Sequence, residues 1–249
     1  RVDDVTRTSL AVVKSAFGTA LDGFRLPYGD VAIGGWRNTP YVVIQNVGAY
    51  LDIPRFLDSD HPIRDGADAD AYLSRLEGYA PVLDGETGRL KAAASKGLIA
   101  PAFLIEKAIR QMEQSVSGAQ QGGGLAESIA RRTKALGISG DWGSRATTIA
   151  RDKVAPALER QLAEIKAQLP KAGMEAGMWA RPQGDEFYAW ALRASTTTLI
   201  SPEEVHQMGL DELRTLHGQM DPILKSLGYT KGSVGERMNA LAKDPRYQF

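Results

Sequence analysis

The sequence predicts a mainly α-helical protein folded as a multi-helix bundle. Apolar residues recur at helical spacing across residues 72–90 and again across residues 149–169, and no stretch alternates strand and helix patterns. A chain of 249 residues with 43% hydrophobic residues is long enough to bury a sizeable core. We therefore expect more than half of the residues in α-helix and little or no sheet.

The first helix is predicted over residues 5–21, where apolar residues follow mixed steps of three and four. Residues 23–35, rich in glycine and proline, are expected to be irregular. Residues 42–57 fit a strand or a helix. The spacing of Val43, Val47 and Tyr50 favours a helix, which Pro54 should kink or end.

From Asp65 the pattern is plainly helical as far as Gly97, which is expected to end the helix. Pro81 interrupts the apolar stripe and predicts a kink, or two helices, near Tyr79. Pro101 suits the first turn of a further helix over residues 102–116.

Residues 115–124 contain three consecutive glycines and are predicted to form a mobile loop. Residues 1–249 are expected to form a single helical region, with a possible internal boundary near residues 117–124. A helix over residues 125–136, a glycine-rich turn and a long helix over residues 144–169 should follow. Pro156 is expected to kink that long helix, and Pro170 to end it.

Residues 173–184 are expected to form a loop or a short hairpin, followed by a helix over residues 186–194. Ser201 with Glu204, and Ser233 with Glu236, are typical of capping boxes that begin the last two helices.

Composition excludes several classes of function. Lys plus Arg equals Asp plus Glu at 30 each, so the net charge gives no attraction to nucleic acid, and we expect no nucleic-acid partner. No apolar run approaches the roughly 20 residues of a membrane-spanning helix. The absence of cysteine removes disulfides, thiolate nucleophiles and cysteine-bound zinc.

The three histidines, His61, His206 and His217, do not predict a metal site. On one helix His206 and His217 would lie about 16 Å apart, which is too far to share a zinc ion. No H-E-x-x-H helix, G-x-S-x-G elbow or phosphate-binding loop occurs. We expect capped or surface histidines, no catalytic residue, and no cofactor in this chain.

The segment 187–193 offers the best candidate binding edge. Phe187 and Trp190 fit the core face of a helix, which leaves Tyr188 and Arg193 for its edge. The alternative is a structural role, with aromatic packing and an arginine near the end of a helix.

Four ordered stretches carry a family resemblance. The run from Tyr188 to Leu210 resembles a hallmark stretch of the bacterial domain-of-unknown-function family 885. This run contains Arg193 and Ser201. Residues 40–62, 68–76 and 232–247 resemble its other motifs. The resemblance covers most of the chain.

The resemblance implies a helical N-terminal half of a larger zincin-like protein, similar to thermolysin-like and oligopeptidase-like zinc peptidases. It implies that zinc and its ligands lie in a C-terminal half absent from this sequence. We predict Tyr188, Arg193, Thr197 and His206 as residues that bind a peptide or small-molecule substrate in the longer protein.

Two functions remain open: residues 1–249 form one wall of the substrate cleft of a zinc-dependent hydrolase, packed on its C-terminal half, or they form a non-catalytic helical binding or structural module. The first residue is Arg1, and the family includes exported lipoproteins, so an exported, periplasmic location is favoured over the cytoplasm.

Overall fold

The fold is that of a mainly α-helical protein, as predicted. The structure, a computed structural model, describes residues 2–26, 28 and 39–247, and 75% of it is helical. The described residues contain no strand, only an isolated bridge between Ile44 and Val47. The prediction of an irregular segment at residues 23–35 lies mostly outside the described residues.

Backbone contacts divide the chain into two compact units, residues 1–195 and residues 196–249. The predicted glycine-rich boundary at residues 117–124 lies inside the first unit. The α-helices of the first unit are α1 (Asp4–Gly23), α2 (Ala49–Arg55), α3 (Gly66–Ser95), α4 (Ala102–Gln120), α5 (Gly123–Ala135), α6 (Trp142–Ile149), α7 (Ala155–Gln168) and α8 (Gly184–Thr196), which ends one residue past the division. Those of the second are α9 (Pro202–Ser226) and α10 (Val234–Ala242).

Short turns of other helical types complete the architecture. Two are π-helical, η1 (Phe56–Asp60) directly after α2 and η2 (Ala150–Val154) between α6 and α7. Three are 3₁₀ turns, η3 (Leu169–Lys171), η4 (Met178–Ala180) and η5 (Pro245–Tyr247).

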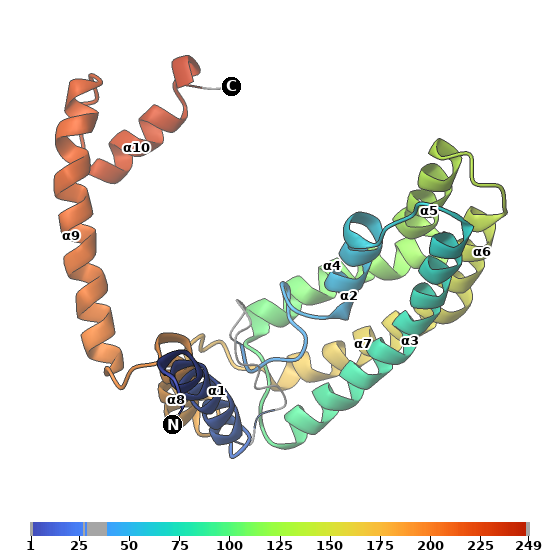
Figure 1. Cartoon of the computed structure of the whole chain (residues 1–249), viewed down its shortest axis with the longest axis horizontal. Coiled ribbons are helices and arrows are strands. Elements are labelled where there is room, and N and C mark those ends of the chain that lie inside the picture. The colour runs from blue at the N-terminus through green and yellow to red at the C-terminus, as the bar shows by residue number, and fades with distance from the viewer. Residues whose placement is uncertain (1, 27, 29–38, 248–249) are drawn as a thin grey trace. The chain divides into compact units, whose positions relative to one another are not determined.

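The main core lies in the first unit, where α3 and α4 both pack along α7 and α5 packs on α6 (Figure 1). The predicted stripe of α3 supplies much of it, since Tyr72, Leu76, Tyr79 and Leu83 are fully buried. A smaller core surrounds Phe187 and Trp190 of α8, as their helical spacing predicts.

The first helix is attached to α8 through one of its faces. Trp190 Nε1 donates to the Thr19 carbonyl over 2.8 Å, and the Trp190 ring lies where a side chain at Gly23 would stand. Because residues advance about 100° around a helix, this face lies opposite the apolar stripe of α1. That stripe, which includes Leu10 and Phe17, is exposed.

The second unit is a helical pair. Arg237 of α10 is buried, and its guanidinium donates to Asp221 of α9 over 2.6 Å. Both predicted capping boxes are present, at Ser201 with Glu204 and at Ser233 with Glu236.

Two predictions were wrong. The helix expected over residues 42–57 begins only at Ala49, because Gly48 has φ +134° and the bridge between Ile44 and Val47 closes a turn before it. The loop expected at residues 115–124 is helical as far as Gln120, and only Gln121 and Gly122 separate α4 from α5.

At two prolines the structure differs from the prediction. α3 runs unbroken through Pro81, so the two-helix alternative is wrong. The long helix expected over residues 144–169 is interrupted before Pro156, where the Ala155 amide bonds to Ala150 in a wide π turn. Proline has no amide hydrogen, so the disturbance falls on the turn before it.

Candidate functional site

The four residues predicted to bind substrate fall in different units. Tyr188 and Arg193 lie on α8, whereas Thr197 and His206 belong to the second unit. Tyr188, Thr197 and His206 are exposed, and Thr197 has φ +58° just after α8 ends. The structure therefore does not show the four as one site, and their role stays a prediction.

Arg193 forms an ion pair with Asp22 of α1. Its Nη2 lies 2.5 Å from Asp22 Oδ2, and both side chains are more than a third exposed. Such exposed pairs contribute about 0–1 kcal/mol. Arg193 thus has a structural partner that fastens α1 to α8.

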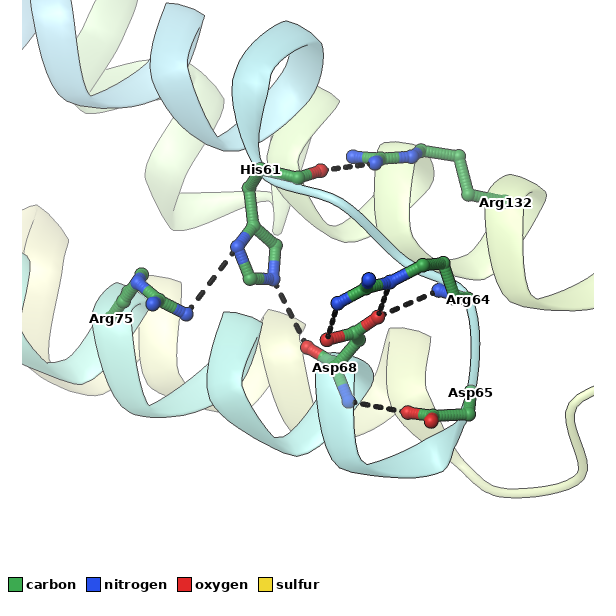
Figure 2. A network of polar contacts seen from close by, with 6 residues as sticks. All are labelled: His61, Arg64, Asp65, Asp68, Arg75 and Arg132. Atoms are coloured by element: carbon green, nitrogen blue, oxygen red, sulfur yellow. Dashed lines mark hydrogen bonds and ion pairs between the residues drawn. The ribbon is translucent and has the colours of Figure 1, made fainter.

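His61 is a buried structural histidine, 2% exposed (Figure 2). Its Nδ1 lies 3.3 Å from Nη1 of Arg75, and its Nε2 lies 3.0 Å from the Asp68 carbonyl oxygen. A guanidinium only donates, so Nδ1 accepts and Nε2 carries the hydrogen that goes to the carbonyl. Both ring nitrogens of His61 therefore have a partner.

Arg132 of α5 closes the π turn η1, reaching across to the chain beside His61 (Figure 2). Its guanidinium donates to the Leu57 and Asp58 carbonyls over 3.0 and 3.1 Å, and to the His61 carbonyl. Carbonyls at the end of a helix lack donors within the helix, and the Arg132 guanidinium donates the hydrogen bonds that they lack.

The start of α3 holds the other end of this segment. Asp65 caps the helix by accepting from the Asp68 amide over 2.9 Å, and Arg64 donates to both carboxylate oxygens of Asp68 (Figure 2). The Arg64 guanidinium lowers the pKa of the Asp68 carboxyl. The segment between η1 and α3 is thus fixed at both ends.

A cavity of about 570 Å³ lies beside this fixed segment, lined by residues of α2, η1, α3, α4, α5, η2 and α7. Both π turns contribute to its wall, through Asp58 of η1 and through Ala150 and Val154 of η2. Such turns are rare and frequently occur at functional sites. The cavity is the strongest candidate site in the described part of the first unit.

The wall of the cavity combines apolar and polar side chains. Leu125, Val154 and Leu158 line it together with the ring of Tyr79. The polar side chains of its wall are Arg55, Asp58, Ser59, Ser115, Glu127, Ser128 and Arg131. Asp58 is already engaged, accepting from Ser128 over 2.6 Å and lying 3.6 Å from Arg131.

Tyr79 carries an unpaired hydroxyl at this cavity. The residue is 1% exposed, and its hydroxyl has no hydrogen-bond partner among the described residues. Burial raises its pKa above the usual value, so it is a neutral donor. The neighbouring Tyr50 differs, because its hydroxyl lies 2.9 Å from the Ile44 carbonyl and 2.8 Å from the Gln111 side-chain amide.

Glu86 places a buried carboxylate at the start of α2. Its oxygens accept from the Ala49 amide over 2.9 and 3.1 Å, and Oε2 accepts from Gln161 Nε2 over 3.2 Å. Burial raises the pKa of this carboxyl, while the hydrogen bonds lower it. Glu86 thus replaces the cap that Gly48 has no side chain to provide.

The described ranges contain neither a metal-binding cluster nor a membrane-spanning helix. No group of three or more His, Cys, Asp or Glu side chains there is arranged to hold a metal ion. None of the helices described is long and apolar enough to span a bilayer.

Sequence reasoning missed the polar role of Tyr79 at the cavity, and those of Glu86 and Arg132 elsewhere in the first unit. Glu86 carried a signal, since it falls between Leu83 and Leu90 on the apolar stripe of α3, where a charged residue needs a buried partner. Tyr79 was assigned to the core, correctly, but its unpaired hydroxyl depends on the packing of other helices.

Comparisons with known proteins give a family and a similar fold. The family profile described as "Bacterial protein of unknown function (DUF885)" matches residues 1–249. A crystal structure described as that of "the putative lipoprotein from Colwellia psychrerythraea" is similar, with a TM-score of 0.76 and 28% identity. The match covers 85% of this chain and 37% of that chain. No curated protein matches.

Proposed function

This chain belongs to the DUF885 family of bacterial proteins, and we propose that it is the helical portion of a longer zinc-dependent hydrolase of peptidase type. In that protein it forms one wall of the substrate cleft. The observation that carries the proposal is an apolar face in each unit that is exposed among that unit's described residues, in a chain that covers only 37% of a protein of similar fold.

The face on α1 runs along Leu10, Val13, Phe17 and Leu21, all of which are exposed. These positions lie within one side of the helix, because they are spaced by three and four residues. An exposed row of large apolar residues is typical of a surface that packs against another element. We assign that element to residues of the longer protein beyond 1–249.

The face on α9 has the same character. Leu210, Leu213, Leu216 and Ile223 are exposed along the helix, and Leu224 is its buried residue. A helix that is amphipathic but buries little of its apolar side lacks the packing that normally stabilises it. We assign its partner to the same missing part.

In this proposal zinc and its ligands come from residues beyond 1–249, as the family resemblance implies. Tyr188 and Arg193 of α8, with Thr197 and His206 of the second unit, remain the proposed substrate contacts. An arginine binds a peptide carboxylate well, because its fork of donors matches two oxygens.

An exported location goes with this function. The similar protein from Colwellia psychrerythraea is described as a putative lipoprotein. We propose that the longer protein to which this chain belongs is likewise exported, where it would meet peptides outside the cytoplasm.

The test compares the longer protein with residues 1–249. We expect one zinc per chain by elemental analysis in the longer protein, chelator-sensitive cleavage of a peptide mixture by mass spectrometry, and neither in residues 1–249. A longer protein free of zinc and inactive on peptides would overturn the hydrolase proposal. One tightly bound zinc in residues 1–249 would overturn the proposal that the zinc ligands lie beyond these residues.

The packing part of the proposal has its own test. Phe17 is 68% exposed in this chain, so Phe17→Asp should leave the melting of residues 1–249 nearly unchanged. In the longer protein it should cost about 1.5–3 kcal/mol, the value of burying such a side chain. Val12→Asp on another side of α1, 62% exposed, is the matched control. Equal effects of the two substitutions in the longer protein would contradict the assignment.

The second candidate is a non-catalytic helical binding module, which the cavity beside η1 and η2 favours, because it is complete within the first unit. The binding-module function would be chosen if the longer protein is inactive and free of zinc while residues 1–249 still bind a small molecule.

A further inference from the structure

We propose that the cavity between η1 and η2 binds a small carboxylic acid with an apolar body, whose carboxylate lies at the glycine-rich start of α5. The site goes beyond the proposed hydrolase, because it is built wholly from residues of the first unit. Its volume of about 570 Å³ falls inside the range of roughly 300–1,000 Å³ typical of ligand pockets.

The apolar body of the ligand is matched by the apolar side chains of the wall. Leu125, Val154 and Leu158 come from three different elements and line the same space as the Tyr79 ring. Burial of an apolar chain against such a wall is favourable in proportion to the area removed from water. These side chains carry no charge, so they select the apolar body of the ligand and not its carboxylate.

The head group is selected by the first turn of α5. Gly122, Gly123 and Gly124 line the cavity, and α5 has no side-chain cap. The first amides of a helix have no acceptor within the helix, and its dipole favours negative charge there. Arg55, which makes no ion pair with any described residue, adds a positive charge to the same wall.

The opposing acidic residues do not cancel this preference. Asp58 accepts a hydrogen bond from Ser128 and pairs with Arg131. Glu127 and Arg55 are both exposed to water, which screens both charges. The first-turn amides of α5 therefore carry the preference of the cavity for an anion.

The unpaired hydroxyl of Tyr79 is an independent observation that points to a ligand. A buried hydroxyl without a partner destabilises the protein, because it has lost its hydrogen bond to water. Tyr79 is almost fully buried, and its residue lines this cavity. A ligand oxygen within reach would restore the lost hydrogen bond.

Two glycines keep the space open at a cost to their helices. Gly118 of α4 and Gly124 of α5 line the cavity, and a side-chain carbon at either would meet nothing within 4 Å. Glycine inside a helix costs about 1 kcal/mol relative to alanine. Neither glycine is required by close packing, so both fit a role in leaving room for a ligand.

The experiment measures calorimetric binding of three probes of equal chain length, octanoate, octanol and octylammonium, to residues 1–249. We expect octanoate to bind at least about tenfold more tightly than octylammonium, with octanol between them, since the first-turn amides of α5 attract only the anion. Equal binding of octanoate and octylammonium, or no binding of any probe, would overturn the proposal.

The site is located by variants. Gly118→Leu should fill the cavity and weaken octanoate binding by more than about tenfold, while helix propensity maintains or raises the melting temperature. The matched control is Gly78→Leu, at an exposed and equally open position of α3 that does not line the cavity. Gly124→Leu repeats the test on α5 should the first variant fold poorly. Equal binding by the cavity-filling variants and the control would refute the location.

Tyr79→Phe removes only the unpaired hydroxyl. We expect it to weaken octanoate binding by about three- to tenfold, the value of one hydrogen bond, and to leave the melting temperature of the free protein unchanged or higher. Tyr247→Phe, at an exposed position of the second unit, is the matched control. Unchanged binding by Tyr79→Phe would remove Tyr79 from the site.

Discussion

The buried carboxylate of Glu86 gives a sharp prediction about stability. Glu86→Ala leaves the buried Ala49 amide without its acceptor, and it removes one of the two acceptors of Gln161 Nε2, which keeps the Leu83 carbonyl. Each such loss costs about 1–3 kcal/mol, so we expect the free energy of unfolding to fall by about 3 kcal/mol. Glu86→Gln keeps an acceptor for the Ala49 amide and removes the buried charge, so it should lie within about 1 kcal/mol of the wild type at pH 7.

The two substitutions also differ in their dependence on pH. Burial raises the pKa of Glu86 in the folded state, so the folded protein holds this proton more tightly than the unfolded chain does. The stability that Glu86 contributes is therefore fully present below its unfolded pKa and is lost as the pH rises through its folded pKa. Glutamine does not titrate, so Glu86→Gln gains stability relative to the wild type between pH 4 and pH 7.

Urea unfolding of the wild type and both variants, followed by circular dichroism at the two pH values, measures these differences. Glu77→Gln on the exposed side of α3 is the control, because its carboxylate pairs with Lys153 at the surface. The reasoning fails if Glu86→Gln is as destabilising as Glu86→Ala. It also fails if the difference between Glu86→Gln and the wild type is the same at both pH values.

Substitutions at two arginines test the other polar contacts. Arg132→Ala should lower the free energy of unfolding by about 2–4 kcal/mol in urea, because three carbonyls around η1 lose a charged donor. Arg132→Lys should recover only part of this loss, since an ammonium cannot reproduce the fork, and full recovery would contradict that view. Arg193→Lys in the longer protein should slow peptide turnover. The weakened ion pair with Asp22 should lower the free energy of unfolding by at most about 1 kcal/mol, measured by melting. A stable and fully active variant would remove Arg193 from the proposed substrate contacts.

The parts of the fold that local rules decide were predictable from the sequence. The stripe of α3 requires one buried side, and its spacing alone identifies Tyr72 and Leu76 as core residues. The capping boxes at Ser201 and Ser233 depend on residues only three apart, so they need no tertiary information.

The errors fall where tertiary contacts outweigh local preference. Val42 and Val43 are buried in irregular chain, because the Tyr50 hydroxyl holds the Ile44 carbonyl and the turn before Gly48 closes on itself. Gly118 remains helical although glycine disfavours helix, because it lies in α4, which packs along α7.

The cavity lay beyond the reach of the sequence for a different reason. Its wall combines side chains from elements up to about a hundred residues apart, such as Arg55 and Leu158. No spacing rule connects them, and an empty space has no residue of its own to leave a pattern. Only the glycines at Gly118 and Gly124 marked it, and they were interpreted as a loop.

The π turn η2 sets the phase between two helices. Buried residues recur every four positions along this stretch, at Trp142, Ala146, Ala150, Val154 and Leu158. In a regular α-helix each such step would drift by about 40° around the axis, because a turn takes 3.6 residues. The wider turn absorbs that drift, so α6 and α7 both face α3. The extra residue of η2 therefore sets the rotation of α7 about its own axis. Deletion of one position there would turn the apolar side of α7 away from α3.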